Sequence, residues 1–174
     1  NQLNPHFMFN AMNSIRALVD EDPVLAKQSI TQLSNLLRNT LLLGNKRLVS
    51  VTDEIKIVRD YLALEKIRFE ERLTFTESVS KDALNGTVPP LIIQTLVENA
   101  IKHGISKKAA GGEVAIYVSK VENQLCIEVH NDGIYEENNK PEVGIGLQNA
   151  RQRLHILYSE DAYLEIGNYN NKVV

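Results

Sequence analysis

The sequence predicts an α+β protein, with a helical region over residues 1–71 followed by a mixed region over residues 72–174. Two observations support this class. Through the first region, apolar residues recur every three or four positions, which is the spacing of one helix face. From residue 72 onward, segments with a period of two alternate with segments of helical period, which indicates strands and helices in one domain. Helices laid on a largely antiparallel sheet, as a sandwich, satisfy both patterns.

Three helices are expected in the first region. Pro5 suits the first turn of a helix, where its missing N–H costs nothing. Asp22 is expected to cap a second helix that starts at Pro23 and stops at Gly44, and Thr52 or Asp53 to cap a third. The predicted apolar faces are Met8, Met12, Ile15 and Val19; Ile30, Leu33, Leu37 and Leu41; and Val51, Ile55, Val58, Leu62, Glu65 and Phe69.

The third of these faces has the alternating spacing of four and three residues that is typical of a coiled-coil seam. Glu65 is its odd member, because a buried carboxylate needs a partner, and Arg68 or a residue on a neighbouring helix is expected to supply one. An antiparallel pair of helices alone buries little surface, so these seams predict a second copy of the chain as partner. We therefore expect a homodimer with an intersubunit bundle formed by the first face and by Val58 and Leu62.

In the second region, "RLTFTESVS" reads as a strand and "VPPLIIQTLVENAIKHG" as a helix that is opened by prolines and closed by Gly104. "EVAIYVSK" and "QLCIEVHN" alternate on either side of a short polar turn, which predicts a hairpin. A polar loop over 132–143 precedes a predicted helix over 144–158. "AYLEIGNY", residues 162–169, is expected to be a strand, and the final "NNKVV" to begin another.

Composition narrows the class of partner. The 174 residues are 43% hydrophobic, enough to bury a core, and the net charge of −3 without a basic block argues against nucleic acid. A single cysteine excludes an internal disulfide and fits a reducing compartment. No apolar run approaches a membrane span. Because the chain opens without Met inside a patterned segment, we expect a fragment of a longer protein, whose parent can be membrane-bound.

Three short stretches of the second region carry chemistry. "LVENAIKHG" places Asn99, Lys102 and His103 within two helical turns, where an amide oxygen suits Mg²⁺ and the other two suit phosphate oxygens. "GIGLQNARQRL" sets Gly144 and Gly146 ahead of a helix, where free N–H groups bind anions. "HNDG" ends a strand and begins the long loop. Each stretch alone is weak evidence, because each also fits ordinary turns or an amphipathic surface.

The order and spacing of these stretches, together with "NPHFMFN" at the start, resemble the GHKL family of ATP-binding domains, and specifically sensor histidine kinases of the LytS/YehU-like type. "NPHFMFNAMNSI" is similar to the phosphoacceptor box of that subfamily. "LIIQTLVENAIKHG" is similar to its N box, "GIGLQNARQRL" to its second glycine box, and "RDYLALEKIRF" to the segment between its two domains. Four boxes in order over nearly the whole chain make the resemblance specific.

The resemblance implies a dimerisation and histidine phosphotransfer region over 1–71 and an ATP-binding catalytic domain over 72–174. It implies that His6 accepts the γ-phosphoryl group of ATP and passes it to an aspartate of a response regulator. The implied ligands of Mg²⁺ and ATP are Asn99 for the metal, and Lys102, His103, Asn131, Gly133, Gly144, Gly146, Leu147, Asn149 and Arg153 for the nucleotide. It also implies that the loop over 132–143 is a lid, and that the fragment is the cytoplasmic portion of a protein anchored in the bacterial inner membrane.

Two departures from the family pattern stand out. Most histidine kinases place an acidic residue after the reactive histidine, whereas this chain has Phe7, so Asn10, one turn on, is the candidate that orients the ring or a water. Where the wider family reads Asp-x-Gly-x-Gly, Asn131 stands for the aspartate and Tyr135 for the second glycine. These changes leave open an alternative, an ATP-binding switch or scaffold without phosphotransfer. Asp132 is the alternative reader of adenine.

Overall fold

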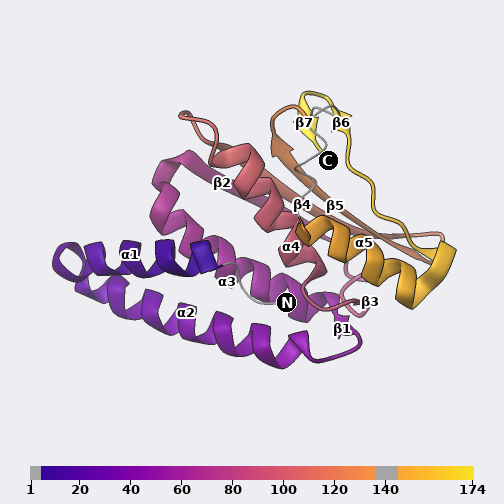
Figure 1. Ribbon diagram of the computed structural model, residues 1–174, viewed down its shortest axis with the longest axis horizontal. Helices are drawn as coiled ribbons and strands as arrows, with labels where there is room; N and C mark the ends of the chain where they lie inside the picture. The colour runs from indigo at the N-terminus through magenta and orange to yellow at the C-terminus, as the bar shows by residue number, and fades with distance from the viewer. Residues whose placement is uncertain (1–4, 136–144) are drawn as a thin grey trace.

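The computed structural model describes residues 5–135 and 145–174, and it has the α+β architecture that the sequence predicts. Its helices are α1 (Pro5–Glu21), α2 (Pro23–Gly44), α3 (Val51–Phe69), α4 (Ile92–Ala100) and α5 (Ile145–Tyr158), with single turns η1 (Glu70–Arg72), η2 (Ile101–Ile105) and η4 (Ser159–Asp161). Its strands are β1 (Val49–Ser50), β2 (Leu73–Val79), β3 (Thr87–Val88), β4 (Gly112–Val121), β5 (Gln124–Asp132), β6 (Asn168–Tyr169) and β7 (Lys172–Val173). In Figure 1, α1 and α2 form a helical hairpin on one side, and α4 and α5 lie over the sheet on the other.

The main sheet has the strand order β2-β4-β5-β7-β6. β2 runs parallel to β4, and the other described pairings are antiparallel, so the sheet is mixed rather than purely antiparallel. The predicted hairpin is confirmed as β4 and β5. Glu122 and Asn123 at its tip both have positive φ, the backbone that a tight hairpin turn requires. Because parallel strands need a long crossover, the chain between β2 and β4 carries α4 back across one face of the sheet.

The predicted face of α3 is confirmed, because all six of its residues are buried. The expected partner of Glu65 is confirmed, because Arg68 Nη1 lies 3.6 Å from Oε2. A second partner, which was not expected, is the Tyr61 hydroxyl on the same helix, which donates to Oε1 at 3.2 Å. The predicted cap of this helix is wrong. Ser50 caps it by accepting from the backbone N–H of Asp53 at 3.1 Å, because the helix begins at Val51, directly after the β1–β3 ladder and at least two residues earlier than predicted.

The predicted faces of α1 and α2 are only partly correct. α1 buries Phe7, Ala11 and Ile15, while Met12 and Val19 are 58% and 51% exposed. The small Ala11 side chain lets α1 lie close to its neighbours α2 and α3, which turns the larger residues outward. On α2, Leu33 and Leu36 are buried, whereas Ile30 and Leu41 are exposed. The cap at Asp22 and the helix end at Gly44 are confirmed.

The strand predicted over 162–169 is mostly wrong. Only Asn168 and Tyr169 pair, with β7, and residues 162–167 have no regular structure. The Arg151 side chain instead donates to the carbonyl of Leu164 at 3.1 Å, which holds this segment against α5. The strand expected at the end of the chain is present as β7, which pairs with both β5 and β6.

A single hydrophobic core runs through both predicted regions. It begins with Phe7 on α1, continues along α3 and α4, and reaches β4, β5 and Ala150 on α5. Val58 and Leu62, at 1% and 0% exposure, belong to this core. The expectation that these two residues form a seam between two copies is therefore wrong, since the chain covers them itself. Within the described ranges, no helix has the length and apolarity needed to cross a bilayer.

Candidate active site

The stretch predicted to bind Mg²⁺ and phosphate forms the last turn of α4 and the π-helical turn η2. Val97, Ala100 and Ile101 are buried on the inner side of this segment, which leaves the half-buried Asn99 and the exposed Lys102 on its outer side. His103 is half-buried, and its Nε2 atom is buried. π-helical turns are rare and are often found at functional sites. The amide of Asn99 and the ammonium of Lys102 are thus presented together, and their role in binding Mg²⁺ and phosphate stays a prediction.

Asn131 lies directly against this segment. A Cβ atom at Gly104 would fall 2.4 Å from Asn131 Nδ2, so only glycine lets η2 approach β5 this closely. Asn131 is 6% exposed, and its Nδ2 donates to the backbone carbonyl of Asp132 at 3.2 Å. The Asp132 carboxylate is engaged elsewhere, since its Oδ2 accepts from the backbone N–H of Glu113 on β4 at 2.8 Å. Of the two candidate readers of adenine, Asn131 is therefore the one packed against the segment that bears Asn99.

The chain leaves β5 through Gly133, whose φ of +154° favours glycine. Two residues later, the backbone of Tyr135 is fixed by the side chain of Asn168 on β6. Asn168 Oδ1 accepts from the Tyr135 N–H at 2.7 Å, and Asn168 Nδ2 donates to the Tyr135 carbonyl at 2.8 Å. The beginning of the predicted lid is thus tied to the β6–β7 hairpin. The remainder of that loop, residues 136–143, and Gly144 lie outside the described residues.

The second glycine box brings α5 against α4. A Cβ atom at Gly146 would come within 3.2 Å of Thr95 Cγ2, one turn before Asn99, so this glycine permits close packing of the two helices. Leu147 is 4% exposed, whereas Asn149 is exposed. Arg153 Nη1 donates to the carbonyl of Pro90 at 2.5 Å, which ties α5 to the segment that enters α4.

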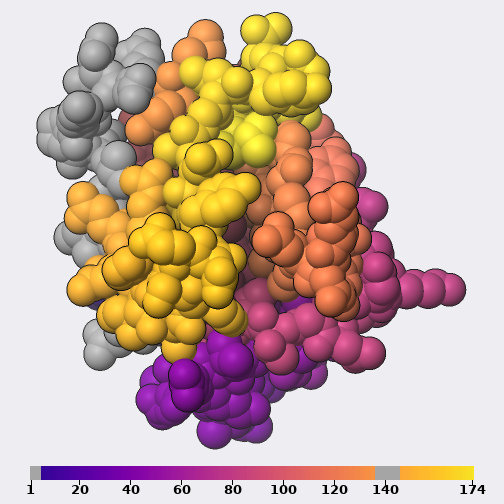
Figure 2. All heavy atoms as spheres, turned by 90° about the vertical axis from the view of Figure 1, so that its right-hand side faces the viewer, coloured from indigo at the N-terminus to yellow at the C-terminus, as the bar shows by residue number. Residues whose placement is uncertain are grey.

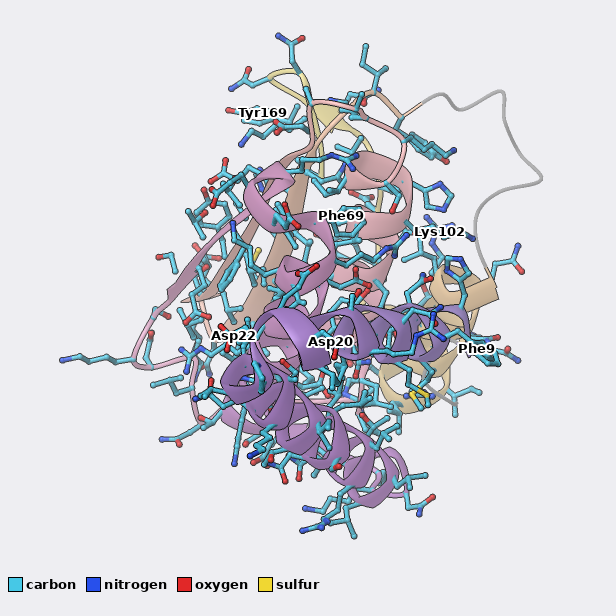
Figure 3. The ribbon with its side chains drawn as sticks, turned by 90° about the vertical axis from the view of Figure 1, so that its left-hand side faces the viewer. Phe9, Asp20, Asp22, Phe69, Lys102 and Tyr169 are labelled. Carbon is cyan, nitrogen blue, oxygen red and sulfur yellow. The ribbon has the colours of Figure 1, made fainter. Side chains whose placement is uncertain are left out.

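The candidate phosphoacceptor lies in the first turn of α1. His6 is exposed, and Asn10 Nδ2 lies 3.1 Å from its Nδ1 atom, so the predicted contact between the two residues is present. The next residue, Phe7, is buried, and its ring centroid lies 4.7 Å from that of Tyr61 on α3. Figure 3 shows Phe9 projecting outward near the start of α1, on the same side of that view as Lys102.

Two buried carboxyl groups, Glu54 and Glu65, and the half-buried Glu98 lie on α3 and α4. Burial raises the pKa of Glu65 on α3, with Arg68 and Tyr61 opposing the rise. Burial also raises the pKa of Glu98 on α4; Gln94 Nε2, which donates to it at 2.8 Å, opposes the rise, and nearby Glu65 adds to it. Glu54, at the start of α3, is fully buried, and desolvation raises its pKa to about 7 against the bonds that its carboxylate accepts.

Sequence reasoning missed two participants. Glu54 reads as an ordinary acidic residue in the first turn of a helix, and nothing local shows that it reaches the backbone of α4. Gly104 reads as a helix stop, although its packing against Asn131 is what joins the N box to β5. The presence of glycine after His103, where the helix continues into η2, is the one local signal that could have suggested a close approach.

The arrangement fits a nucleotide with its magnesium ion. Asn99 offers an amide oxygen beside a cation, and the buried amide of Asn131 lies on the adjoining strand. In the part of the chain that the structure describes, no three His, Cys, Asp or Glu side chains gather closely enough to hold a metal ion. A single protein oxygen suits Mg²⁺ that shares its remaining positions with phosphates and water.

Comparison with known proteins agrees with these observations. Residues 1–73 match the family model of histidine kinases. The chain is 34% identical over 177 residues to the sensor protein LytS of Staphylococcus saprophyticus, covering 95% of this chain and 30% of that protein. The curated relatives that it matches are thus much longer, and the chain spans 30% of their length.

Solved structures show the same fold. The histidine kinase domain of the blue-light activated kinase from Erythrobacter litoralis EL346 superposes with a TM-score of 0.56 at 18% identity, covering 98% of this chain and 92% of that one. Histidine kinase ThkA, in complex with the response regulator protein TrrA, gives a TM-score of 0.51 at 17% identity, over 97% of this chain and 57% of that one. The four sequence boxes, their placement in the fold and these relatives agree, and the chain belongs to the histidine kinase family.

Proposed function

We propose that this chain is the catalytic portion of an ATP-dependent protein-histidine kinase of a two-component system, which phosphorylates itself on His6. The observation that carries the proposal is the coexistence of an exposed His6–Asn10 pair on α1 with the Asn99, Lys102 and Asn131 arrangement on α4, η2 and β5. The switch or scaffold alternative explains the second group of residues and leaves the first without a role.

In the proposed reaction, Asn10 sets the tautomer of His6. Asn10 Nδ2 faces His6 Nδ1 in the structure; with the amide turned so that its oxygen faces Nδ1 instead, Nδ1 carries the proton and Nε2 presents its lone pair. Nε2 then attacks the γ-phosphorus of ATP, the bond to the bridging oxygen breaks as ADP leaves, and Nδ1 releases its proton to solvent. This step needs little beyond position and neutralisation of charge.

The other residues hold the nucleotide. Asn99 supplies an oxygen ligand to Mg²⁺, whose charge neutralises the phosphates, and Lys102 and His103 contact phosphate or ribose. Asn131 reads the adenine edge, and Gly133, Gly144 and Gly146 let the backbone approach the nucleotide. Asn149 and Leu147 line the first turn of α5, and Arg153 supports that helix through Pro90.

The phosphoryl group then passes to an aspartate of a response regulator. The complex of the structurally similar kinase ThkA with its response regulator supports this part of the proposal. Large apolar side chains that stay exposed on α1 and α2, among them Phe9, Met12, Ile30 and Leu41, support a homodimer in which a second copy covers them. The family resemblance supports a location at the cytoplasmic side of the bacterial inner membrane within a longer protein.

Incubation with γ-labelled ATP and Mg²⁺ tests the proposal. The wild-type chain should acquire acid-labile label, and His6→Gln should abolish it while nucleotide affinity stays within a few fold. Asn35→Ala, an exposed change on α2, is the matched control and should label normally. Labelling of His6→Gln at the wild-type rate would overturn the assignment of His6. ATP binding without label in the parent protein would favour the switch or scaffold.

A further inference from the structure

Backbone and side-chain hydrogen bonds connect the start of α3 to the start of α4. β1 pairs with β3, so the residues before α3 form a ladder with the residues before α4. The N–H of Val51 donates to the carbonyl of Gly86 at 2.8 Å, and the Thr52 hydroxyl donates to the carbonyl of Leu84 at 3.0 Å. The first turn of α3 therefore obtains its hydrogen-bond partners from the chain that leads into α4.

Glu54, in the first turn of α3, in turn accepts hydrogen bonds from the backbone at the start of α4. Its Oε1 accepts from the N–H of Leu91 and its Oε2 from the N–H of Ile93 at 3.0 Å. The first N–H groups of any helix lack partners within that helix and carry the positive end of its dipole. α4 thus receives its cap from a carboxylate on another helix, and no side chain at Leu91 itself caps it.

Leu91 has a backbone conformation that requires such support. Its φ of 62° lies in the left-handed region, which is costly for a residue with a branched side chain. Two further elements, α5 and α2, contact the same point. Arg153 on α5 donates to the preceding carbonyl, of Pro90, and a Cβ at Gly44, the end of α2, would touch Leu91 Cδ1 at 3.7 Å. Figure 2 shows α5, in gold, lying above the purple end of α2.

This junction decides where the candidate site lies. α4 is a short rigid helix, and Asn99 follows Ile93 by six residues, about 9 Å along the axis. A shift of the α4 start therefore moves the residue that holds Mg²⁺. The opposite end of the same segment packs against β4 and β5, where Ile105 is buried and Gly104 contacts Asn131, itself a proposed nucleotide contact.

We propose that Glu54 is a positioning residue of the nucleotide site, which fixes α4 to α3 through its carboxylate so that Asn99 and Lys102 meet Mg²⁺ and phosphate. The proposal rests on the proposed function. It extends the site to a residue of the helical region that does not touch the nucleotide. It also joins the two predicted regions at a charged, buried contact, so a movement of α3 is transmitted to the metal ligand.

The test compares Glu54→Gln, Glu54→Asp and Leu62→Ala for Mg²⁺–ADP affinity by calorimetry and for thermal midpoint, at pH 8, above the pKa of about 7 of Glu54, so that its carboxylate is ionised. Gln keeps the shape but loses the charge and one acceptor, so an N–H of α4 is left without a partner, and affinity should fall about tenfold. Asp keeps the charge and both acceptors and should lose less. Leu62→Ala, a core change on the same helix, should lower the midpoint and leave affinity within twofold.

The possible outcomes distinguish the positioning role of Glu54 from the proposed nucleotide binding itself. The positioning role is supported if Mg²⁺–ADP affinity falls in Glu54→Gln, falls less in Glu54→Asp, and stays near the wild-type value in Leu62→Ala. Wild-type affinity in Glu54→Gln, or an equal loss in Leu62→Ala, overturns it while the proposed nucleotide binding stands. If Glu54→Gln does not fold, Glu54→Asp against Leu62→Ala decides by the same comparison. A wild-type chain that binds no Mg²⁺–ADP overturns both proposals.

Discussion

Phe7 and Tyr61 join the candidate phosphoacceptor helix to α3, with ring centroids 4.7 Å apart and the rings tilted by 41°. Both side chains are buried, at 4% and 3% exposure, and Phe7 immediately follows the exposed His6. The Tyr61 hydroxyl donates to Glu65, and burial followed by the charges of Glu65 and Glu98 raises its pKa. An aromatic contact of this kind places His6 relative to the helix that is itself bound to α4.

Replacement of Phe7 should therefore destabilise the fold. Phe7→Ala removes a buried ring and should lower the free energy of unfolding by about 3–5 kcal/mol. Phe9→Ala is the matched control, because Phe9 is 69% exposed, and it should change the stability of the isolated chain by less than about 0.5 kcal/mol. Urea unfolding of both variants measures the difference, and equal losses would show that Phe7 does not anchor α1.

Asn99→Ala should impair catalysis while leaving the fold intact. Asn99 is half-buried and its neighbours Val97 and Ala100 hold the helix, so the thermal midpoint should stay near that of the parent. Loss of a preorganised ligand at an active site typically costs about 2.7–4 kcal/mol, a reduction of several hundredfold in labelling rate. Normal labelling and normal Mg²⁺–ATP affinity would identify Asn99 as a surface residue.

Gly104→Ala should disturb Asn131. The new Cβ would meet Asn131 Nδ2 at 2.4 Å, so either η2 or β5 must move, and both stability and nucleotide affinity should fall. In an Asn131→Ala background, the same substitution meets no amide and should cost less stability. Additive losses in this double-mutant cycle would contradict a direct contact between the two positions.

Glu54 should make stability depend on pH. Its pKa is about 7 in the folded chain against an ordinary value of 4.5, so the folded state keeps a proton that the unfolded state has lost. The stabilisation is complete below pH 4.5 and is lost as pH rises through 7, with a total that corresponds to about 3 kcal/mol. Chemical unfolding of wild type and Glu54→Gln between pH 5 and 8 measures it. A slope that is the same in both would contradict the assignment to Glu54.

The homodimer should depend on the exposed faces of α1 and α2 rather than on α3. Ile30 is 52% exposed on α2, so Ile30→Glu should dissociate a dimer and leave the monomer folded. Lys27→Glu, an exposed polar change on the same helix, should leave association unchanged. Sedimentation equilibrium reports both, and a wild-type chain that stays monomeric at high concentration would count against a second copy on this surface.

The parts of the fold that the sequence predicts are those that local patterns determine. The α3 face holds because Ile55, Val58 and Leu62 are covered on one side by α1 and α2 and on the other by α4, so periodicity and burial coincide. The faces of α1 and α2 failed because exposure of Met12 or Ile30 depends on which neighbour is present. Pattern alone also could not show that "AYLEIGNY" packs against α5 instead of pairing along its length.

In the candidate site, too, some features follow from local sequence patterns and others depend on tertiary packing. The boxes around Asn99 and Gly146 are contiguous in the chain, so spacing alone locates them on α4 and α5. The contacts of Glu54 with Leu91 and Ile93 join residues 37 and 39 positions apart, and they depend on the angle at which two helices meet. That angle is set by packing over the whole core, and no local signal in one sequence reports it.

The continuity of the core has a consequence for biosynthesis. Phe7 and Ala150 belong to one buried cluster, so the apolar surface of α1 is not fully covered until α5 has been synthesised. β2 likewise cannot pair until β4, its parallel neighbour, has been synthesised, and α4 is synthesised between the two strands. While this part of the protein is synthesised, the nascent chain therefore exposes apolar surface, and it should depend on chaperones more than a chain in which residues 1–71 close a core of their own.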